Sequence, residues 1–162
     1  SFAKNQIMAL AEYGIYLDGA EFRPNDIITQ LDFFVLLSKT MGYYSSSPIT
    51  NDSAKEEIDD LYNYLIREGV ITKEEKKPDS TVRREDAVKY IINAMKYGEV
   101  AKLKGIFNCT FSDKDNITPE LVGYVTIAQG FKIVRGDNGK FNPPAELSRA
   151  DAAIMIYNYL QR

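Results

Sequence analysis

The amino-acid sequence predicts an all-α fold built from three consecutive helix-loop-helix modules. Three segments of twenty residues repeat one pattern, in which a proline stands two residues after the start, an aliphatic residue six after it and an aspartate ten after it. The segments begin 54 and 65 residues apart, and self-similarity at such intervals is typical of repeat architectures. Apolar residues at helical spacing fill the second half of each segment, which predicts a helix there. The segments are FRPNDIITQLDFFVLLSKTM from Phe22, KKPDSTVRREDAVKYIINAM from Lys76 and FNPPAELSRADAAIMIYNYL from Phe141.

A first helix is predicted ahead of the repeated pattern in each module, because the stretch before each segment is amphipathic. These three helices are expected over residues 2–13, 53–68 and 119–129. Each ends near a glycine, the residue that best suits the left-handed position after a helix C-terminus. The three glycines are Gly14, Gly69 and Gly130.

Start signals agree with this periodicity. Ser53 with Glu56 predicts a capping box at the second of these first helices. Thr118 followed by Pro119 predicts a cap with proline at the first helical position of the third. The remaining stretches, 43–52 and 97–116, are expected to be connectors.

The second helix of each module, here called the motif helix, is predicted to begin near Gln30, Arg84 or Arg149. Thr29 and Ser148 stand immediately before two of these starts, where their hydroxyl groups can accept a first-turn N–H as N-caps. Arg83 stands at the equivalent place in the second module, so the cap there must come from Ser80, Thr81 or water. The third motif helix is expected to bury one face, formed by Ala150, Ala153, Ile154, Tyr157 and Leu160.

Arg149 is an unusual residue for a first helical turn. A cation there opposes the positive end of the helix dipole, which typically costs about 0.3–1 kcal/mol. The side chain is either solvated, or paired with Glu146 or Asp151, or present to bind an anion, because a helix N-terminus and a guanidinium together suit a carboxylate or phosphate. On stability grounds Arg149→Ala is expected to leave the free energy of unfolding unchanged or slightly raised.

Composition excludes several classes of function. The chain has 162 residues, 20 basic and 23 acidic, which argues against a nucleic-acid binder. The absence of histidine excludes Ser/His/Asp and Cys/His nucleophile systems and every histidine-ligated metal site. Cys109 is the single cysteine, so no internal disulfide can form. No run of 18 apolar residues exists, and no signal peptide precedes the first helix, so we expect a piece of a longer protein without membrane insertion.

Catalysis by paired carboxylates is not expected either. The acids that could serve a glycoside hydrolase mostly stand at helix starts, where capping explains them: Asp32, Glu56, Asp86 and Asp151. The stretches FSDKDN and RGDNG do not continue into the ligand spacing of a calcium loop. We therefore predict a binding or structural protein with no cofactor and no metal.

The repeated pattern resembles the S-layer homology (SLH) domain. The residues that carry the resemblance are Phe-x-Pro followed by Ile/Leu-Thr/Ser-Arg-x-Asp/Glu, as in NGKFNPPAELSRADAAIMIYNYL, which RGD precedes. The resemblance spans the chain as three repeats: 1–46, whose start is truncated, 47–107 and 108–162. It implies one compact unit with pseudo-threefold symmetry, a central bundle of motif helices and grooves between neighbouring modules.

The same resemblance implies noncovalent anchoring of a larger secreted protein to the bacterial cell wall, and thus an extracellular location at the cell surface. The implied partner is an anionic secondary cell-wall polysaccharide, commonly pyruvylated, and the motif arginine faces the groove. This makes Arg149 and Arg84 the leading ligand-binding candidates, with Arg83 and Gln30 beside them. FSD at 111–113 is similar to the opening of the family's repeat, which adds Asp113.

Departures from the family pattern define the alternative. Gln30 replaces the arginine of the first module, so that groove is expected to contribute little. Lys76 replaces the phenylalanine of the second module, whose loop is expected to be irregular, and Phe2 stands where the family often has tryptophan. The alternative is a degenerate scaffold or protein-interaction module that no longer binds the wall. Two surviving arginines of three favour retained but reduced ligand binding.

Overall fold

The protein is all-α, and the computed structural model describes residues 3–162. Phe2, which stands where the family often has tryptophan, lies outside the described residues. Among those residues β-structure is limited to isolated bridges. The α-helices are α1 (Lys4–Glu12), α2 (Gln30–Thr40), α3 (Lys55–Arg67), α4 (Arg84–Ala94), α5 (Gly98–Ala101), α6 (Val122–Gly130) and α7 (Arg149–Gln161). Single 3₁₀ turns form at Lys73–Glu75, Lys114–Asn116 and Pro119–Leu121.

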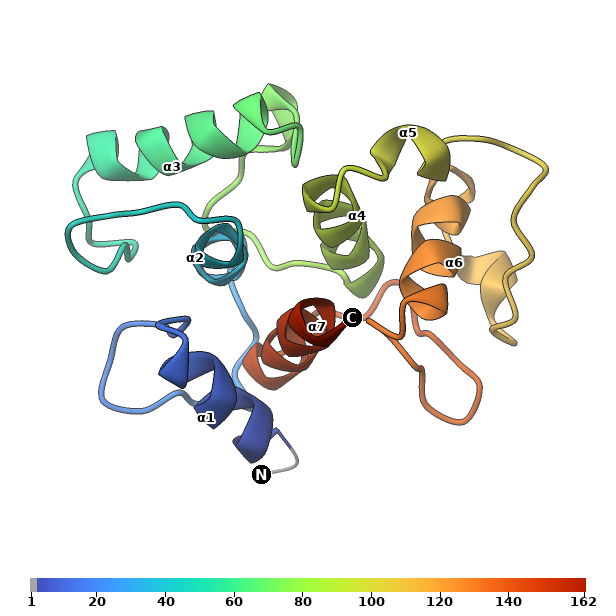
Figure 1. The fold of residues 1–162 in the computed structure, drawn as a ribbon, viewed down its shortest axis with the longest axis horizontal. Coiled ribbons are helices and arrows are strands. Elements are labelled where there is room, and N and C mark those ends of the chain that lie inside the picture. Colours follow the sequence, from blue (N-terminus) through green and yellow to red (C-terminus); the bar gives the residue numbers. More distant parts are fainter. Residues whose placement is uncertain (1–2) are drawn as a thin grey trace.

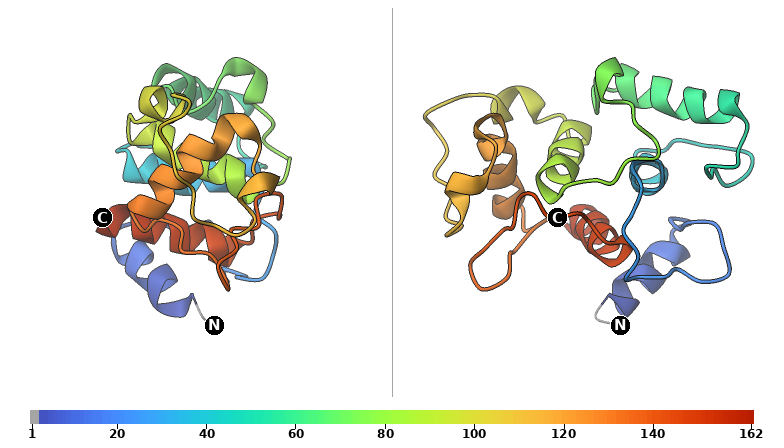
Figure 2. Two further views of the ribbon diagram at one scale, coloured as in Figure 1. Left: turned by 90° about the vertical axis from the view of Figure 1, so that its right-hand side faces the viewer. Right: turned by 180° about the vertical axis from the view of Figure 1, so that it is seen from behind.

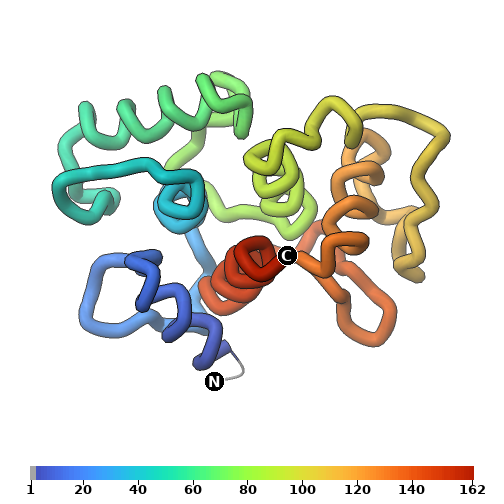
Figure 3. Tube along the Cα trace, viewed as in Figure 1, coloured from blue at the N-terminus to red at the C-terminus, as the bar shows by residue number. Residues whose placement is uncertain are grey.

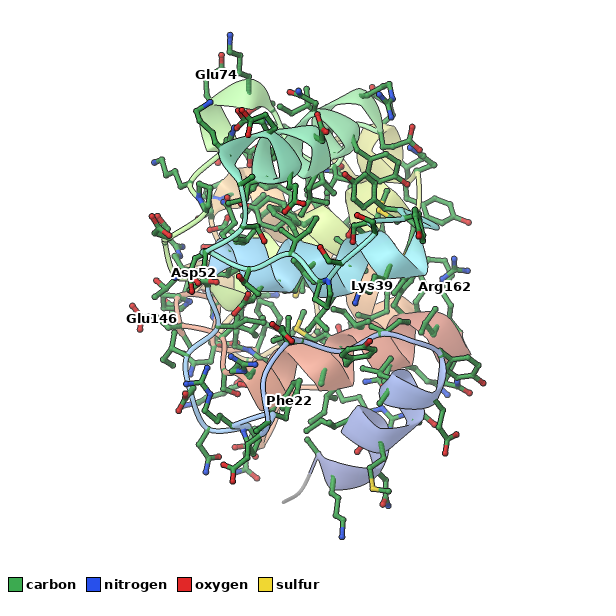
Figure 4. All side chains as sticks on the ribbon, turned by 90° about the vertical axis from the view of Figure 1, so that its left-hand side faces the viewer. Phe22, Lys39, Asp52, Glu74, Glu146 and Arg162 are labelled. Carbon is green, nitrogen blue, oxygen red and sulfur yellow. The ribbon has the colours of Figure 1, made fainter. Side chains whose placement is uncertain are left out.

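The three motif helices, α2, α4 and α7, lie together in the middle of the molecule (Figure 1). Their predicted starts are confirmed, because the helices begin at Gln30, Arg84 and Arg149. Helix α7 packs against both α2 and α4. Helices α2 and α4 meet through Phe34 and Tyr90, whose ring centroids are 4.9 Å apart. Lys39 and Arg162 lie at the same end of the bundle, so α2 and α7 run in the same direction (Figure 4).

The first helix of each module, here called the outer helix (α1, α3 or α6), packs on the motif helix of another module. Helix α1 packs on α7 of the third module, and α6 packs on α4 of the second. Helix α3 contacts α2 of the first module through an edge-to-face pair of Tyr62 and Phe34, with centroids 5.7 Å apart. Each outer helix therefore covers the motif helix of the preceding module in a cycle, and the views from the side and from behind show this arrangement (Figure 2).

Backbone hydrogen bonds close the same cycle at the helix starts. The first two N–H groups of each motif helix donate to carbonyl groups in the proline loop of the next module, and the path of these loops can be followed in Figure 3. The pairs are Gln30 to Ser80 (2.7 Å), Leu31 to Pro78 (3.0 Å), Arg84 to Ala145 (2.9 Å), Glu85 to Pro143 (3.2 Å), Arg149 to Asp26 (2.8 Å) and Ala150 to Pro24 (2.9 Å). These donors would otherwise be unsatisfied. The N-terminus of α7 therefore does not offer the N–H groups of Arg149 and Ala150 to an anion. An anion at this helix start would have to be bound by side chains.

The N-caps predicted at Ser148 and Thr29 are confirmed, whereas those predicted at Ser53 and Thr118 are wrong. The hydroxyl groups of Ser148 and Thr29 accept from the backbone N–H three residues on, at 3.0 and 3.2 Å. Arg83 provides no side-chain cap at α4. Ser53 does not cap α3, which begins at Lys55, because its hydroxyl accepts from the N–H of Thr50 instead.

Three further expectations are corrected. Gly130 is part of α6, and Lys132 takes the left-handed position beyond it with φ 62°. The connector 97–116 contains the short helix α5 and a 3₁₀ turn. On α7 the face that is buried carries Ala152, Met155 and Ile156 beside the expected alanines, whereas Leu160 is 37% exposed. The helix turns this face inward because it contacts α1, α2 and α4 rather than one neighbour.

Candidate ligand-binding grooves

Three equivalent junctions form where the first residue of a motif helix meets the next module. At the two arginine junctions the first residue lies beside the residue that opens the next repeated segment and the aspartate ten positions later. The Arg84 junction contains Arg84, Phe141 and Asp151, and the Arg149 junction contains Arg149, Phe22 and Asp32. At the Gln30 junction the side chain of Gln30 instead contacts Lys77, Glu75 and Tyr62. The sequence pattern located these positions, but it explained the aspartates by capping alone and assigned no role to the two phenylalanines.

The Arg84 junction opens onto a groove. Arg84 Nε donates to the carbonyl oxygen of Phe141 at 2.9 Å, and the guanidinium carbon lies 5.4 Å from the centre of that ring. One terminal nitrogen lies 3.8 Å from the carboxylate of Asp151, and 18% of the Arg84 side chain remains exposed. The groove has a volume of about 970 Å³ and is lined by Arg84, Asp113, Asp151 and much of the loop 136–142. A smaller hollow of about 160 Å³ lies beside Arg84 and Asp151.

Asp113 shapes the wall of this groove. Its carboxylate accepts from the backbone N–H of Phe141 at 2.9 Å and of Asn142 at 2.8 Å. Burial acts to raise the pKa of Asp113, but these hydrogen bonds outweigh it and the pKa is lowered. The ionised carboxylate therefore fixes the loop that carries Phe141, against which Arg84 is held.

The Arg149 junction is closed. The Arg149 guanidinium lies 5.2 Å from the ring centre of Phe22 and 3.7 Å from the carboxylate of Asp32, but only 5% of its side chain is exposed. Its Nε is buried and has no hydrogen-bond partner within residues 3–162. Figure 4 shows Phe22 next to the end of α7 that lies away from Arg162.

Burial dominates the electrostatics of this closed pair. It lowers the pKa of Arg149, an effect that Asp32 partly opposes. It also raises the pKa of Asp32, while Arg149 and Arg23 pull that pKa down. Arg149 is therefore neither a solvated surface residue nor a cation that faces an open groove, and its neutral contribution to stability is no longer expected.

The Gln30 junction is filled by the protein itself. Gln30 Nε2 donates to the carbonyl oxygen of Glu75 at 2.9 Å, and its Oε1 accepts from the hydroxyl of Tyr62 and the N–H of Lys77, both at 2.8 Å. The residue is 5% exposed. Lys76 turns away to Asp59, with its Nζ 2.5 Å from the carboxylate. Both the amide nitrogen and the amide oxygen of Gln30 therefore have hydrogen-bond partners within the protein.

Arg83 lies outside the three junctions. It forms an ion pair with Glu85, whose side chain is fully buried. Glu85 also accepts from the N–H of Thr118 at 3.0 Å and from its hydroxyl at 2.8 Å. Thr118 therefore joins α4 to the start of the third module instead of capping the helix that follows. Glu85 was missed in the sequence because an acid in a first helical turn is ordinarily a solvent-exposed residue.

No cluster of three or more acidic, cysteine or histidine side chains suited to a metal ion occurs among residues 3–162. None of the helices that these residues form combines the length and the apolarity required to cross a membrane.

Comparison with known proteins gives a family match in the C-terminal part of the chain. Residues 110–153 match the family model of the S-layer homology domain, and this range includes Asp113, the loop 136–142 and Arg149. S-layer homology domains are in general cell-wall anchoring modules and not catalytic units. The chain is also 25% identical over 171 aligned residues to an amylopullulanase of Thermoanaerobacterium thermosulfurigenes. That alignment covers 100% of this chain and 9% of the relative, so the chain spans a small part of the relative's length.

Proposed function

We propose that the chain is a noncovalent cell-wall anchoring unit, not an enzyme, made of three S-layer homology modules with pseudo-threefold symmetry. We assign the modules to residues 1–46, 47–107 and 108–162. The family match in the third module supports this proposal. The hydrogen bonds that repeat in a cycle at the three motif-helix starts support it for the other two.

The proposed ligand is an anionic secondary cell-wall polysaccharide, with pyruvyl groups as the source of charge. The observation that carries this assignment is the guanidinium of Arg84 at the edge of a groove of about 970 Å³. Because Nε donates to the Phe141 carbonyl and one terminal nitrogen lies 3.8 Å from Asp151, the other terminal nitrogen remains to hold a ligand carboxylate in a charge-assisted hydrogen bond. Asp113 supports this contact indirectly, since it fixes the loop that positions Phe141.

The other candidate residues take smaller parts in the proposed site. Arg149 and Gln30 are enclosed in their junctions, and Arg83 is paired with Glu85. We therefore assign wall binding chiefly to the Arg84 groove. Binding at one groove of three agrees with the loss of the motif arginine in the first module.

The proposed setting is the surface of a bacterial cell, with this chain as part of a larger secreted protein. The alignment to 9% of a much longer relative supports a place within a larger polypeptide.

Cosedimentation with purified cell walls tests the proposal. The wild-type chain is expected to pellet with native walls and to stay in solution with walls stripped of secondary polymer. Arg84→Ala should stay in solution in both cases. Arg67→Ala is the matched control, because Arg67 also lies over an aromatic ring, that of Tyr64 at 5.6 Å, but outside the groove.

A degenerate scaffold is the second candidate function, and the closure of the Arg149 and Gln30 junctions favours it. It predicts that the wild-type chain stays in solution with native walls, or that stripping the secondary polymer makes no difference.

A further inference from the structure

A tight turn of four residues, 137–140, stands at the rim of the Arg84 groove. Asp137, Asn138 and Lys140 line the groove, and all four residues of the turn are exposed. The N–H of Asp137 donates to the carbonyl oxygen of Lys140 at 2.8 Å, and the N–H of Lys140 donates back to that of Asp137 at 2.9 Å. Asn138 and Gly139 form the tip with φ of 51° and 78°, and Asn-Gly suits a tip in which both residues have positive φ.

The two residues at the tip are not restrained by hydrogen bonds. Within residues 3–162 the side-chain amide of Asn138 has no hydrogen-bond partner, and the N–H of Gly139 donates to no acceptor. A Cβ added at Gly139 would meet nothing within 4 Å, so the space around this residue is open. The amide carbon of Asn138 and the backbone nitrogen that follows it are therefore free to approach each other.

An asparagine that precedes a glycine can modify itself, because no side chain crowds the glycine nitrogen. The backbone nitrogen of Gly139 attacks the side-chain amide carbon of Asn138, and a cyclic imide forms. The bond to the side-chain nitrogen breaks, and that nitrogen leaves as ammonia with the proton that the backbone nitrogen loses. Water then opens the imide at one of its two carbonyl groups, which leaves either an aspartate or an isoaspartate.

Other exposed asparagines in the chain lack these conditions. Asn138 is the one asparagine that a glycine follows. Asn142 lies in the same loop but precedes Pro143, whose nitrogen carries no hydrogen to lose. Asn51 is also exposed, but the N–H of the next residue, Asp52, donates to the Thr50 hydroxyl at 3.2 Å. These two asparagines are therefore internal controls.

We propose that Asn138 is a site of spontaneous deamidation, which converts a neutral side chain at the rim of the Arg84 groove into a carboxylate. The groove wall already carries more carboxylates than cations, from Asp113, Asp137, Asp151, Arg84 and Lys140. One more negative charge lowers the attraction of the groove for an anionic ligand. This consequence rests on the proposed function, whereas the reaction itself does not.

Peptide mapping by mass spectrometry, during incubation of the folded chain at mildly alkaline pH, tests the reaction. Trypsin cleaves after Arg135 and Lys140, so Asn138 is contained in the peptide 136–140. This peptide should gain the mass difference between an amide and an acid and should separate into two products. The rate should lie within about tenfold of that in a synthetic peptide of the same sequence, a margin wider than the loss of one hydrogen bond would cause. Asn138→Gln, which keeps an amide on a longer side chain, should remain unmodified.

Calorimetric titration of a pyruvylated wall fragment into Asn138→Asp measures the consequence for the groove. At low salt the variant should bind about twofold more weakly than unmodified wild type, the effect of one unit charge about 10 Å away in water. The matched control is Asp137→Asn, which removes a charge from the same turn and should strengthen binding by a similar factor.

Three results would overturn the proposed reaction. They are no mass gain at Asn138 in the folded chain while the synthetic peptide reacts, a mass gain at Asn51 that is as fast, or the same gain in Asn138→Gln. Equal affinities of Asn138→Asp and unmodified wild type would overturn the effect on the groove. Failure of the unmodified wild type to bind would count against the proposed wall-binding function instead, and the mass measurement does not depend on it.

Discussion

Arg84 and Arg149 occupy the same position of the repeated pattern, yet one faces a groove and the other is enclosed. Their contacts are nearly the same: each lies 5.2–5.4 Å from a phenylalanine ring centre and 3.7–3.8 Å from an aspartate. The exposed fraction of the side chain differs, at 18% for Arg84 and 5% for Arg149. The pattern therefore determines the first contacts of the arginine, whereas the loop of the facing module determines whether a ligand can reach it.

The facing loops explain the difference. At the Arg84 junction Asp113 holds the backbone of Phe141 and Asn142, and the Phe141 carbonyl accepts from Arg84 Nε. At the Arg149 junction no carboxylate among residues 3–162 holds Phe22 in this way, and Arg149 Nε is left without a partner. One arginine is thus positioned at a groove edge, and the other serves as a buried ion pair.

The largest expected effect is on the stability of the closed junction. Arg149→Ala should lower the free energy of unfolding by about 3 kcal/mol, because it breaks a buried pair and removes packing from Phe22. Arg84→Ala should cost about 1 kcal/mol, the value of one hydrogen bond in a more open place. Urea denaturation of both variants measures this difference. Equal losses of free energy in the two variants would contradict the view that one junction is closed and the other open.

The next prediction concerns the Gln30 junction, which is closed by the hydrogen bonds of a glutamine and not by an arginine. Gln30→Ala should lower stability by about 2 kcal/mol, since it leaves the groups around Tyr62, Glu75 and Lys77 without their partner. Gln30→Arg should also be destabilising and should not create a wall-binding site, because the space is occupied by this network. Thermal denaturation measures the first effect and wall cosedimentation the second. A stable Gln30→Arg variant with increased wall binding would contradict the account of a filled junction.

The effect of Asp113→Asn on the free energy of unfolding is expected to depend on pH. The folded-state pKa of Asp113 is lowered from its ordinary value of 3.8, so its stabilising effect is fully present above that pH. The effect is lost as the pH falls through the lowered folded-state pKa. Asp113→Asn should therefore cost about 1–2 kcal/mol at neutral pH, and the gap to wild type should close in acid below pH 3.8. Denaturation curves between neutral pH and acid decide this, and a gap that is independent of pH would rule out the ionised carboxylate as the cause.

The smallest effects concern the side-chain N-caps of α2 and α7, which α4 lacks. Ser148→Ala and Thr29→Ala should each cost about 1 kcal/mol, because each removes the acceptor for a first-turn N–H. Ser46→Ala, at an exposed loop position, is the control and should have no measurable effect. Chemical denaturation is sufficient. If Ser148→Ala lowers the free energy of unfolding as much as Arg149→Ala does, Ser148 stabilises more of the protein than the first turn of α7.

The sequence predicted much of this fold because repeats, caps and apolar spacing are local signals. The starts of α2, α4 and α7, the caps at Thr29 and Ser148 and the all-α class follow from such signals. Helix ends were less predictable. The sequence predicts Gly130 just beyond α6, whereas Gly130 ends that helix and Lys132 takes the left-handed conformation.

The site was less predictable than the fold. The positions of Arg84, Asp113 and Arg149 were found, but their exposure depends on which module faces each helix start. The carbonyl groups of Pro24 and Asp26 take the N–H groups that an anion was expected to use at α7. Similarly, no local pattern shows that Glu85 is fully buried between Arg83 and Thr118. Contacts across 33 residues or more of sequence decide these cases.

Calorimetric titration of a pyruvylated wall fragment into wild type, Arg84→Ala and Arg149→Ala tests the central claim most directly. Removing Arg84 should weaken binding by about tenfold to a hundredfold, the worth of a charge-assisted pair. Arg149→Ala, measured at a temperature where the variant is still folded, should bind within about twofold of wild type, since a change of that size is below one hydrogen bond. Chemical removal of pyruvate should reduce wild-type affinity to that of Arg84→Ala. If Arg149→Ala loses the greater share of affinity, or if both variants bind like wild type, the open junction is not the site of anion recognition.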